Sequence, residues 1–137
     1  MTSAKLIRVL ATLLLTASSF SSAFAAVWHV DGDAAFSGDG TSWETAFRRI
    51  QDGIDAASDG DTVIVAPGTY AEKVTIERKG VTLRSSNPAN AKVVGMTIIQ
   101  GTRGSGSAVD IRGSAGENAI IDGFTITGSR HSGVRCG

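Results

Sequence analysis

The sequence has 137 residues, a formal net charge of zero, an apolar fraction of 42%, 17 glycines and 6% aromatic residues. This length allows at most one ordinary domain, and many glycines with few aromatics favour numerous short turns over a large packed core. A chain without a basic excess has no positive field to attract nucleic acid, so we expect no nucleic-acid partner.

The first 25 residues have the pattern of a signal peptide. Lys5 and Arg8 form a positive start, an apolar stretch of about a dozen residues follows, and Ala-Phe-Ala at 23–25 is a small-x-small cleavage signal. A membrane anchor is the alternative, but it needs about 18 or more apolar residues, and Arg8 and the serines of 18–22 interrupt this stretch. We therefore predict a signal peptide at 1–25. The protein would be secreted, periplasmic or on the cell surface, with no membrane span after cleavage and a slightly acidic mature chain.

Residues 26–61 are predicted to hold a strand, a turn-rich segment and a helix. The strand is AVWHVD, and the turn-rich segment is DGDAAFSGDG. Thr41 and Glu44 have the spacing of a capping box, which predicts that a helix begins there. Apolar residues then recur every three or four positions, at Trp43, Phe47, Ile50, Ile54 and Ala57. No second helix pattern follows, so a helix of about fourteen residues must pack its apolar face on strands.

From residue 62 onward, short apolar runs alternate with turns. Strands are predicted at 62–65, 73–76, 80–83, 92–94, 96–99, 108–111, 119–121, 124–126 and 133–136. Val63 and Val65 should point into an apolar column beneath the helix, and Pro67-Gly68 should form a turn. Cys136 cannot form an internal disulfide because it is the single cysteine, and we predict a small buried hydrophobe there rather than a reactive thiol.

An internal repeat distinguishes a solenoid from a sandwich. The segment that begins at Val93 aligns with the segment that begins at Ile120. The aligned pairs are Gly95 with Gly123, Thr97 with Thr125, Ile98 with Ile126, Ser107 with Ser132 and Val109 with Val134. A strand-rich period in the twenties, with a turn of variable length, is typical of stacked coils that bury one continuous apolar column.

The mature sequence resembles the N-terminal region of secreted right-handed parallel β-helix proteins of the pectate-lyase-like superfamily. It is most similar to the family nine pectate lyases and to uncharacterised β-helix proteins that share this opening. The motifs that carry the resemblance are GDGTSW at 38–43, GDTVIV at 60–65, PGTY at 67–70, GFTITG at 123–128 and SGV at 132–134. The resemblance implies an all-β, right-handed parallel β-helix whose end is covered by an N-terminal capping helix.

Residues 62–137 would form only the first coils of such a fold. About 75 residues are enough for roughly three coils, near the minimum for a shared column. The sequence ends in SGVRCG, inside a repeat and without a polar capping element. We therefore expect a truncated chain, the N-terminal part of a longer product.

Three residues are candidates for a catalytic site. According to the resemblance, lyases of this superfamily remove a proton beside a uronate carboxylate, with a Lys or Arg base and Ca²⁺ held by several carboxylates. Asp110, Asp122 and Arg135 have suitable side chains, but two acids are fewer than the roughly three that such a site needs. The alternative is that they are solvated polar positions on alternating strands. We expect this segment alone to be inactive, since the family nine cluster lies further downstream than this chain extends.

A calcium site is a second candidate. Asp31, Asp33 and Asp39 lie in the segment DGDAAFSGDG and could bind Ca²⁺ through carboxylate oxygens. Tight turns use Asp and Gly at the same density, so a purely structural role is the alternative.

Two function classes remain. The first is a carbohydrate-associated protein that binds or acts on extracellular acidic polysaccharide, and if the full-length protein is an enzyme it would be a polysaccharide lyase. The second is a non-catalytic cell-surface or adhesion solenoid. One scaffold carries both classes, so residues further along the chain would have to distinguish them.

Overall fold

The computed structural model describes residues 24–104, 106–113 and 118–137, so the predicted signal peptide lies almost wholly outside it. The strands are β1 (Val27–Val30), β2 (Thr62–Val65), β3 (Gly68–Tyr70), β4 (Val74–Glu77), β5 (Thr82–Ser85), β6 (Thr97–Gln100), β7 (Ser107–Arg112), β8 (Ile120–Asp122), β9 (Thr125–Thr127) and β10 (Ser132–Cys136). The helices are α1 (Ile50–Ala56) and α2 (Ala91–Met96). Neither helix has the length and hydropathy needed to cross a membrane.

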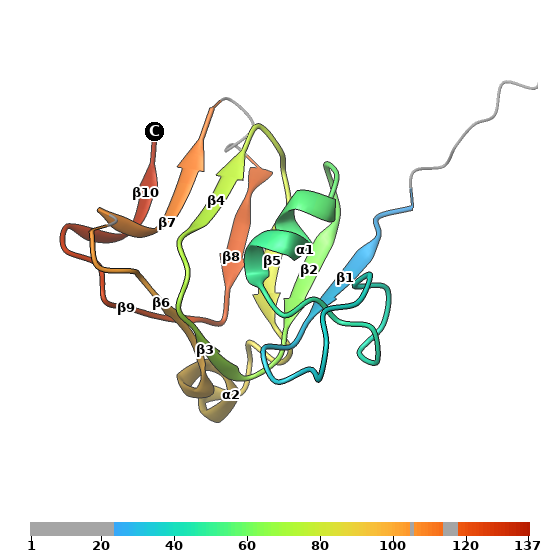
Figure 1. The fold of residues 1–137 in the computed structure, drawn as a ribbon. Coiled ribbons are helices and arrows are strands. Elements are labelled where there is room, and N and C mark those ends of the chain that lie inside the picture. The colour runs from blue at the N-terminus through green and yellow to red at the C-terminus, as the bar shows by residue number, and fades with distance from the viewer. Residues whose placement is uncertain (1–23, 105, 114–117) are drawn as a thin grey trace, which may run out of the picture.

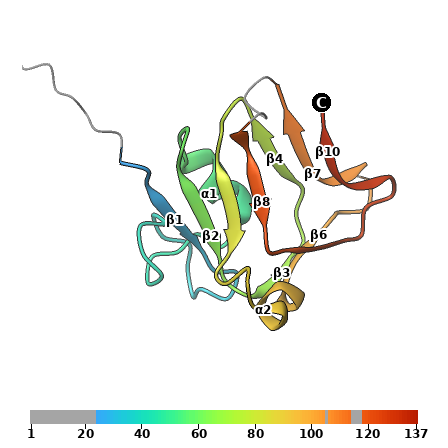
Figure 2. The same ribbon diagram turned by 180° about the vertical axis from the view of Figure 1, so that it is seen from behind.

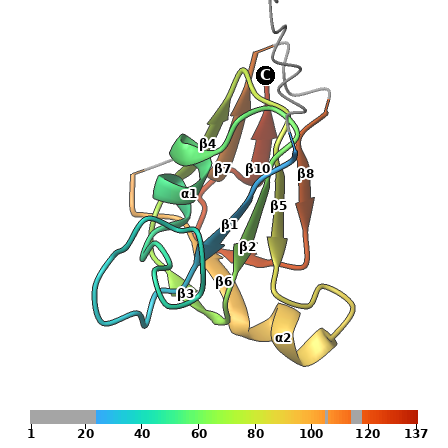
Figure 3. The ribbon, with the colours of Figure 1, turned by 90° about the vertical axis from the view of Figure 1, so that its right-hand side faces the viewer.

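The strands form three parallel sheets, in the orders β1-β2-β5-β8, β3-β6-β9 and β10-β7-β4. From β2 onward each strand pairs with the third strand after it, so successive triplets of strands add one strand to each sheet (Figure 1). Parallel neighbours cannot be joined by a hairpin, and here the other two strands of the triplet provide the crossover. Viewed from the side of β1, the sheets surround a common interior (Figure 3). The described part is consistent with an all-β solenoid.

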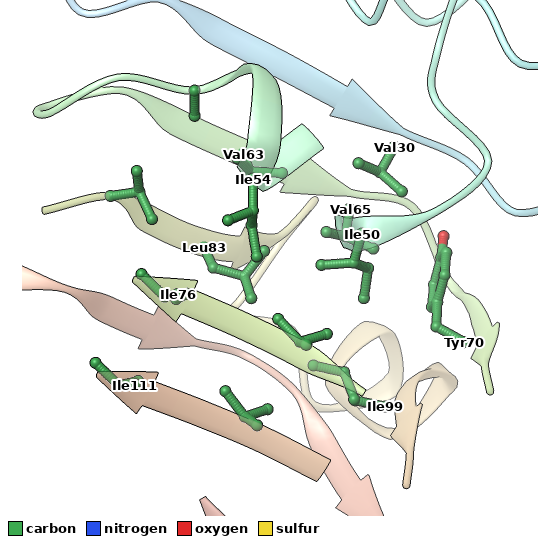
Figure 4. Packing of buried hydrophobic residues seen from close by; sticks show 14 of the residues in the cluster. Val30, Ile50, Ile54, Val63, Val65, Tyr70, Ile76, Leu83, Ile99 and Ile111 are labelled. Atoms are coloured by element: carbon green, nitrogen blue, oxygen red, sulfur yellow. The ribbon is translucent and has the colours of Figure 1, made fainter. Parts of the chain in front are cut away.

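The interior is an apolar column built from alternate residues of the strands. Val63 and Val65 are fully buried, as predicted, and they stack in register on Leu83 and Ser85 of β5. The same alternation buries Val74 and Ile76 of β4, and their register partners Val109 and Ile111 of β7 are buried as well. Figure 4 shows Ile50 and Ile54 of α1 lying over this column, close to Val63 and Val65. The prediction that a helix covers the first strands is therefore confirmed.

Helix α1 is shorter than predicted, and the predicted capping box is wrong. Instead of starting a helix, the Thr41 hydroxyl donates to Asp39. Phe47 forms a parallel bridge with Val30, its N–H donates to the His29 carbonyl, and its carbonyl accepts from the Asp31 N–H. The edge of β1 thus pairs with the backbone N–H and carbonyl groups of Phe47, which the sequence pattern had placed in the predicted helix.

Distant side chains cap both ends of α1. The carboxylate of Glu72 accepts from the N–H groups of Ile50 at 2.9 Å and Gln51 at 3.1 Å. At the other end, Lys79 Nζ donates to the carbonyls of Ile54 at 2.8 Å and Ala57 at 3.0 Å. An acid at the helix start and a base at its end both complement the helix dipole. These contacts hold the short helix over the column.

Two further segments correct the predictions. The strand predicted at 92–94 lies in α2, because the Asn90 side chain accepts from the Lys92 and Val93 N–H groups and caps a helix there. The expectation of a single helix is therefore wrong. The turn predicted at Pro67-Gly68 leads directly into β3, whose Tyr70 donates its hydroxyl proton to the Ala66 carbonyl.

The predicted repeat is confirmed in one half and shifted in the other. Ser107 pairs with Ser132 and Val109 with Val134, as aligned. Between β6 and β9, however, Ile98 pairs with Thr125 and Ile99 with Ile126, one residue away from the alignment. The observed register brings Ile99 of the core cluster side by side with Ile126, which is partly buried and packs against that cluster. A slip of one residue would turn one of them outward, so burial decides the register.

The predicted burial of Cys136 is wrong. Its register partner is the buried Ile111, but Cys136 itself is exposed. β10 is the last strand of its sheet in the described chain, and its other side has no neighbouring strand there. β10 therefore has the alternation of an inward-facing strand, but among the described residues no further strand covers its Cys136 side chain.

Candidate functional site

A cluster of charged side chains lies on the outer face of the β10-β7-β4 sheet. Because Val109 and Ile111 point into the column, the alternation of β7 places Asp110 on the outer face, and Arg112 extends the same alternation at the strand end. Arg135 of β10 is the register partner of Asp110. Strands β4, β7 and β10 lie side by side in this sheet (Figure 1).

Asp110 is the buried centre of this cluster. Its Oδ2 accepts from Arg112 at 2.6 Å (Nη2) and 3.0 Å (Nε), and Lys73 Nζ lies 3.3 Å from the same oxygen. The Asp110 side chain is 4% exposed, whereas those of Lys73 and Arg112 are 33% and 52% exposed. A buried carboxylate is tolerated when it is paired and hydrogen-bonded, as it is here.

These contacts fix the charge states of the pair. The hydrogen bond from Arg112 is the largest influence and lowers the pKa of Asp110; Lys73 also lowers it, against the opposing effect of burial. The same hydrogen bond raises the pKa of Arg112. Asp110 is therefore a carboxylate near neutral pH and orients two cations, and it is poorly suited to accept a proton from a ligand.

A cavity of about 370 Å³ opens over the cluster. It is lined by Lys73, Gly106, Ser107, Asp110, Arg112, His131, Ser132 and Arg135. Lys73, Arg112 and Arg135 face the single carboxylate, so the cavity carries a positive excess although the formal net charge of the whole sequence is zero. Arg and Lys side chains with exposed ends, beside Ser hydroxyls, are suited to bind carboxylate or sulfate groups.

The structure brings together two of the three predicted catalytic candidates. Asp110 and Arg135 both line the cavity. Asp122 lies in β8 of a different sheet, where it pairs in register with Arg84. The two acids are therefore not part of one site.

The sequence interpretation missed Lys73 as a member of this cluster. Asp110 and Arg112 are two residues apart on one strand, which is a sequence signal for a shared face. Lys73 precedes β4, and it reaches Asp110 because Val74 pairs with Val109, 35 residues away. No local pattern reveals such a pairing.

The predicted calcium ligands have local partners in the turns. Asp31 Oδ1 accepts from the Asp33 N–H at 3.0 Å, and Asp39 Oδ1 accepts from the Thr41 N–H and hydroxyl at 3.1 and 2.8 Å. Hydrogen bonds from Thr45 and Thr41 lower the pKa of Asp39 to about 2. Across the residues whose structure is described, no group of three or more His, Cys, Asp or Glu side chains could hold a metal ion. Calcium binding at these positions stays a prediction.

Two curated proteins are similar to this chain over part of its length. A probable pectinesterase/pectinesterase inhibitor 17 from Arabidopsis thaliana is 34% identical over 84 residues, or 60% of this chain and 15% of that protein. A cell surface glycoprotein from Methanothermus fervidus is 32% identical over 87 residues, or 62% of this chain and 13% of that protein. The chain thus spans less than a sixth of the length of either relative.

Comparison with protein families and with solved structures does not assign the chain to a family or a fold. No protein-family profile matches the sequence, and no solved structure matches it. The two partial relatives are consistent with a carbohydrate-associated or cell-surface role, without specificity for one substrate.

Proposed function

We propose that this chain folds as a right-handed parallel β-helix in an exported protein, and that it binds acidic polysaccharide through the Asp110 cluster. The cluster is defined as Lys73, Asp110, Arg112 and Arg135. The observation that carries the proposal is the cationic cavity over the outer face of three neighbouring parallel strands. The partial similarity to a pectinesterase-related protein supports a pectin-like ligand.

The geometry suits an extended polyanion. Lys73 precedes β4, Arg112 ends β7, and Arg135 lies in β10, so the cations come from three successive strands of one sheet. Neighbouring strands are about 4.8 Å apart, which spreads the positive charges over roughly 10 Å along the column. A chain of uronate residues that runs across the strands could place successive carboxylates against these cations. Arg112 and Arg135 can each offer two parallel N–H groups to a carboxylate.

The role proposed for the cluster is binding rather than catalysis. Asp110 is already engaged with Arg112 and Lys73, so it positions cations and does not act as a base. If the whole protein is a polysaccharide lyase, we propose that its base and its calcium ligands come from other positions. Within the proposal, the cluster would hold the polysaccharide beside such a site.

A non-catalytic cell-surface solenoid is the second candidate function. The similarity to a cell surface glycoprotein over 62% of this chain favours it. Under this alternative the column would be a structural or adhesive element, and the cationic cavity would have no polysaccharide ligand.

Binding to polygalacturonate tests the proposal. We expect calorimetry at low salt to detect binding of polygalacturonate but not of an uncharged dextran. Arg135→Gln should weaken binding about 5- to 10-fold, because one exposed charge contact is lost, and added salt should weaken it further. Arg84→Gln, which removes an arginine from the β1-β2-β5-β8 sheet, is the matched control and should leave the affinity unchanged.

Two outcomes would contradict this proposal. Absence of polygalacturonate binding at low salt would favour the surface solenoid. Equal losses in Arg135→Gln and Arg84→Gln would show non-specific charge attraction. A parallel assay with millimolar Ca²⁺, following the absorbance of unsaturated product, should give no signal from this chain.

A further inference from the structure

One buried carboxylate holds the residues that follow the predicted cleavage site. Asp61 Oδ1 accepts from the Ala26 backbone N–H at 2.8 Å. Its Oδ2 accepts from Trp28 Nε1 at 3.0 Å and from the Ser58 N–H at 2.8 Å. Asp61 is only 6% exposed. Both oxygens therefore accept hydrogen bonds from neutral donors inside the protein.

Ala26 is also where the first sheet begins. Its carbonyl accepts from the Thr62 N–H at 2.9 Å, and the next residue, Val27, pairs with Thr62 in the β1-β2 ladder. Phe24 and Ala25 are exposed. The boundary between exposed chain and anchored chain thus coincides with the Ala25–Ala26 bond that the signal-peptide pattern predicts to be cut.

We propose that Asp61 is the binding site for the α-ammonium group that signal-peptide cleavage creates on Ala26. In this step a signal peptidase hydrolyses the Ala25–Ala26 peptide bond with water. The water oxygen becomes part of the Ala25 carboxylate, and Ala26 receives the proton and leaves as an amine, which is protonated near neutral pH. The amide donor to Asp61 is thereby replaced by a cation at the same position.

The exchange would give a buried carboxylate its counter-ion. Before cleavage the negative charge of Asp61 is stabilised by N–H donors that carry no charge. The charge of Lys79, between β4 and β5, also stabilises it. A buried ion that gains a partner of opposite charge, at hydrogen-bond distance, is stabilised because the interior screens the attraction weakly. The folded state would therefore favour the processed chain over the precursor.

The charge states are compatible with an ion pair. Burial acts to raise the pKa of Asp61, but hydrogen bonds from Ser58, Trp28 and Ala26 and the charge of Lys79 outweigh it and lower the pKa below its usual value. An α-amino group ordinarily has a pKa of about 7.7–8.0. At a pH above the pKa of Asp61 and below that of the α-amino group, both groups are charged. Asp59 is the flanking acid, and it is engaged with the Gly80 N–H at 2.9 Å.

The first test uses the full chain expressed in a bacterial host that exports it. Mass spectrometry of the exported protein should show Ala26 as the first residue. With ¹³C-labelled alanine, NMR titration of Ala26 should give an α-amino pKa about one unit or more above the ordinary 7.7–8.0, which corresponds to a 10-fold preference for the charged form. In Asp61→Asn the pKa should return to the ordinary range.

The matched control changes only the charge. Selective acetylation of the exported chain at Ala26 keeps an N–H donor for Asp61 but removes the ammonium. We expect the acetylated chain to have an unfolding equilibrium constant about 10-fold larger at pH 6. Because the folded pKa of the amine is raised, this stabilisation is complete below the unfolded pKa and is lost as the pH rises through the folded value, so the two chains should converge near pH 11.

Two results would overturn the proposal. One is a first residue other than Ala26 in the exported protein. The other is an ordinary α-amino pKa in the unmodified exported chain, a measurement that does not depend on any variant folding. Neither result bears on polysaccharide binding, which is tested separately.

Discussion

The two ends of the described apolar column differ in whether another element covers their apolar residues. At one end, beside β1 and β2, α1 buries Ile50 and Ile54 against the first strands and is capped by Glu72 and Lys79. At the other end, on the opposite side of the molecule in Figures 1 and 2, the strand β10 leaves Val134 38% exposed. Both ends contain inward-facing apolar residues in register. Among the described residues, strand pairing alone therefore leaves β10 exposed, whereas α1 covers the first strands.

The largest expected effect compares an isoleucine of the covering helix α1 with a valine at the other end of the column. Ile50→Asp places an unpaired charge against the column and should lower the free energy of unfolding by roughly 3 kcal/mol or more. Val134→Asp, on the half-exposed β10, should cost about 1 kcal/mol or less. Urea unfolding at pH 7 measures both. Equal losses would mean that α1 is no better buried than β10.

The next effect concerns the caps of α1. Glu72→Gln weakens two hydrogen bonds to the Ile50 and Gln51 N–H groups and should cost about 1–2 kcal/mol, comparable to loss of a helix cap. Glu44→Gln alters the acid of the predicted capping box, which does not cap α1, and should leave the unfolding midpoint unchanged. A larger loss of stability in Glu44→Gln than in Glu72→Gln would support the sequence-based prediction that the helix begins at Thr41.

The smallest effect is a pH dependence on the outer face of the β10-β7-β4 sheet. The pKa of Asp110 is lowered in the folded state, so its contribution to stability is present above its unfolded pKa of about 3.9 and is lost as the pH falls through the lower folded value. The difference in unfolding free energy between the parent and Asp110→Asn should therefore be constant from pH 7 to about pH 5 and shrink below pH 4. A difference that persists unchanged to pH 2 would contradict the ion pair.

The strands were mostly predictable because their signal is local. A short apolar run rich in β-branched residues, between turn residues, was sufficient to locate β2, β4, β6 and β7 within one residue at each end. α2 was missed because its residues Val93 and Val94 are β-branched, while the deciding feature is the Asn90 cap. The candidate site was half predicted, since Asp110 and Arg135 were identified and Lys73 was not.

By itself, the sequence determined the alternation of apolar residues, the turns and the stacking of Ser107 on Ser132, because each depends on neighbours along one or two strands. Only the tertiary structure decided where α1 begins, which register joins β6 to β9, and how Lys73 reaches Asp110. In each case the deciding partner is distant in sequence: the edge of β1 takes the backbone of Phe47, and Glu72 supplies the cap. A buried backbone group or charge must find a partner somewhere, and in a solenoid that partner commonly lies in the adjacent layer, outside the reach of local pattern.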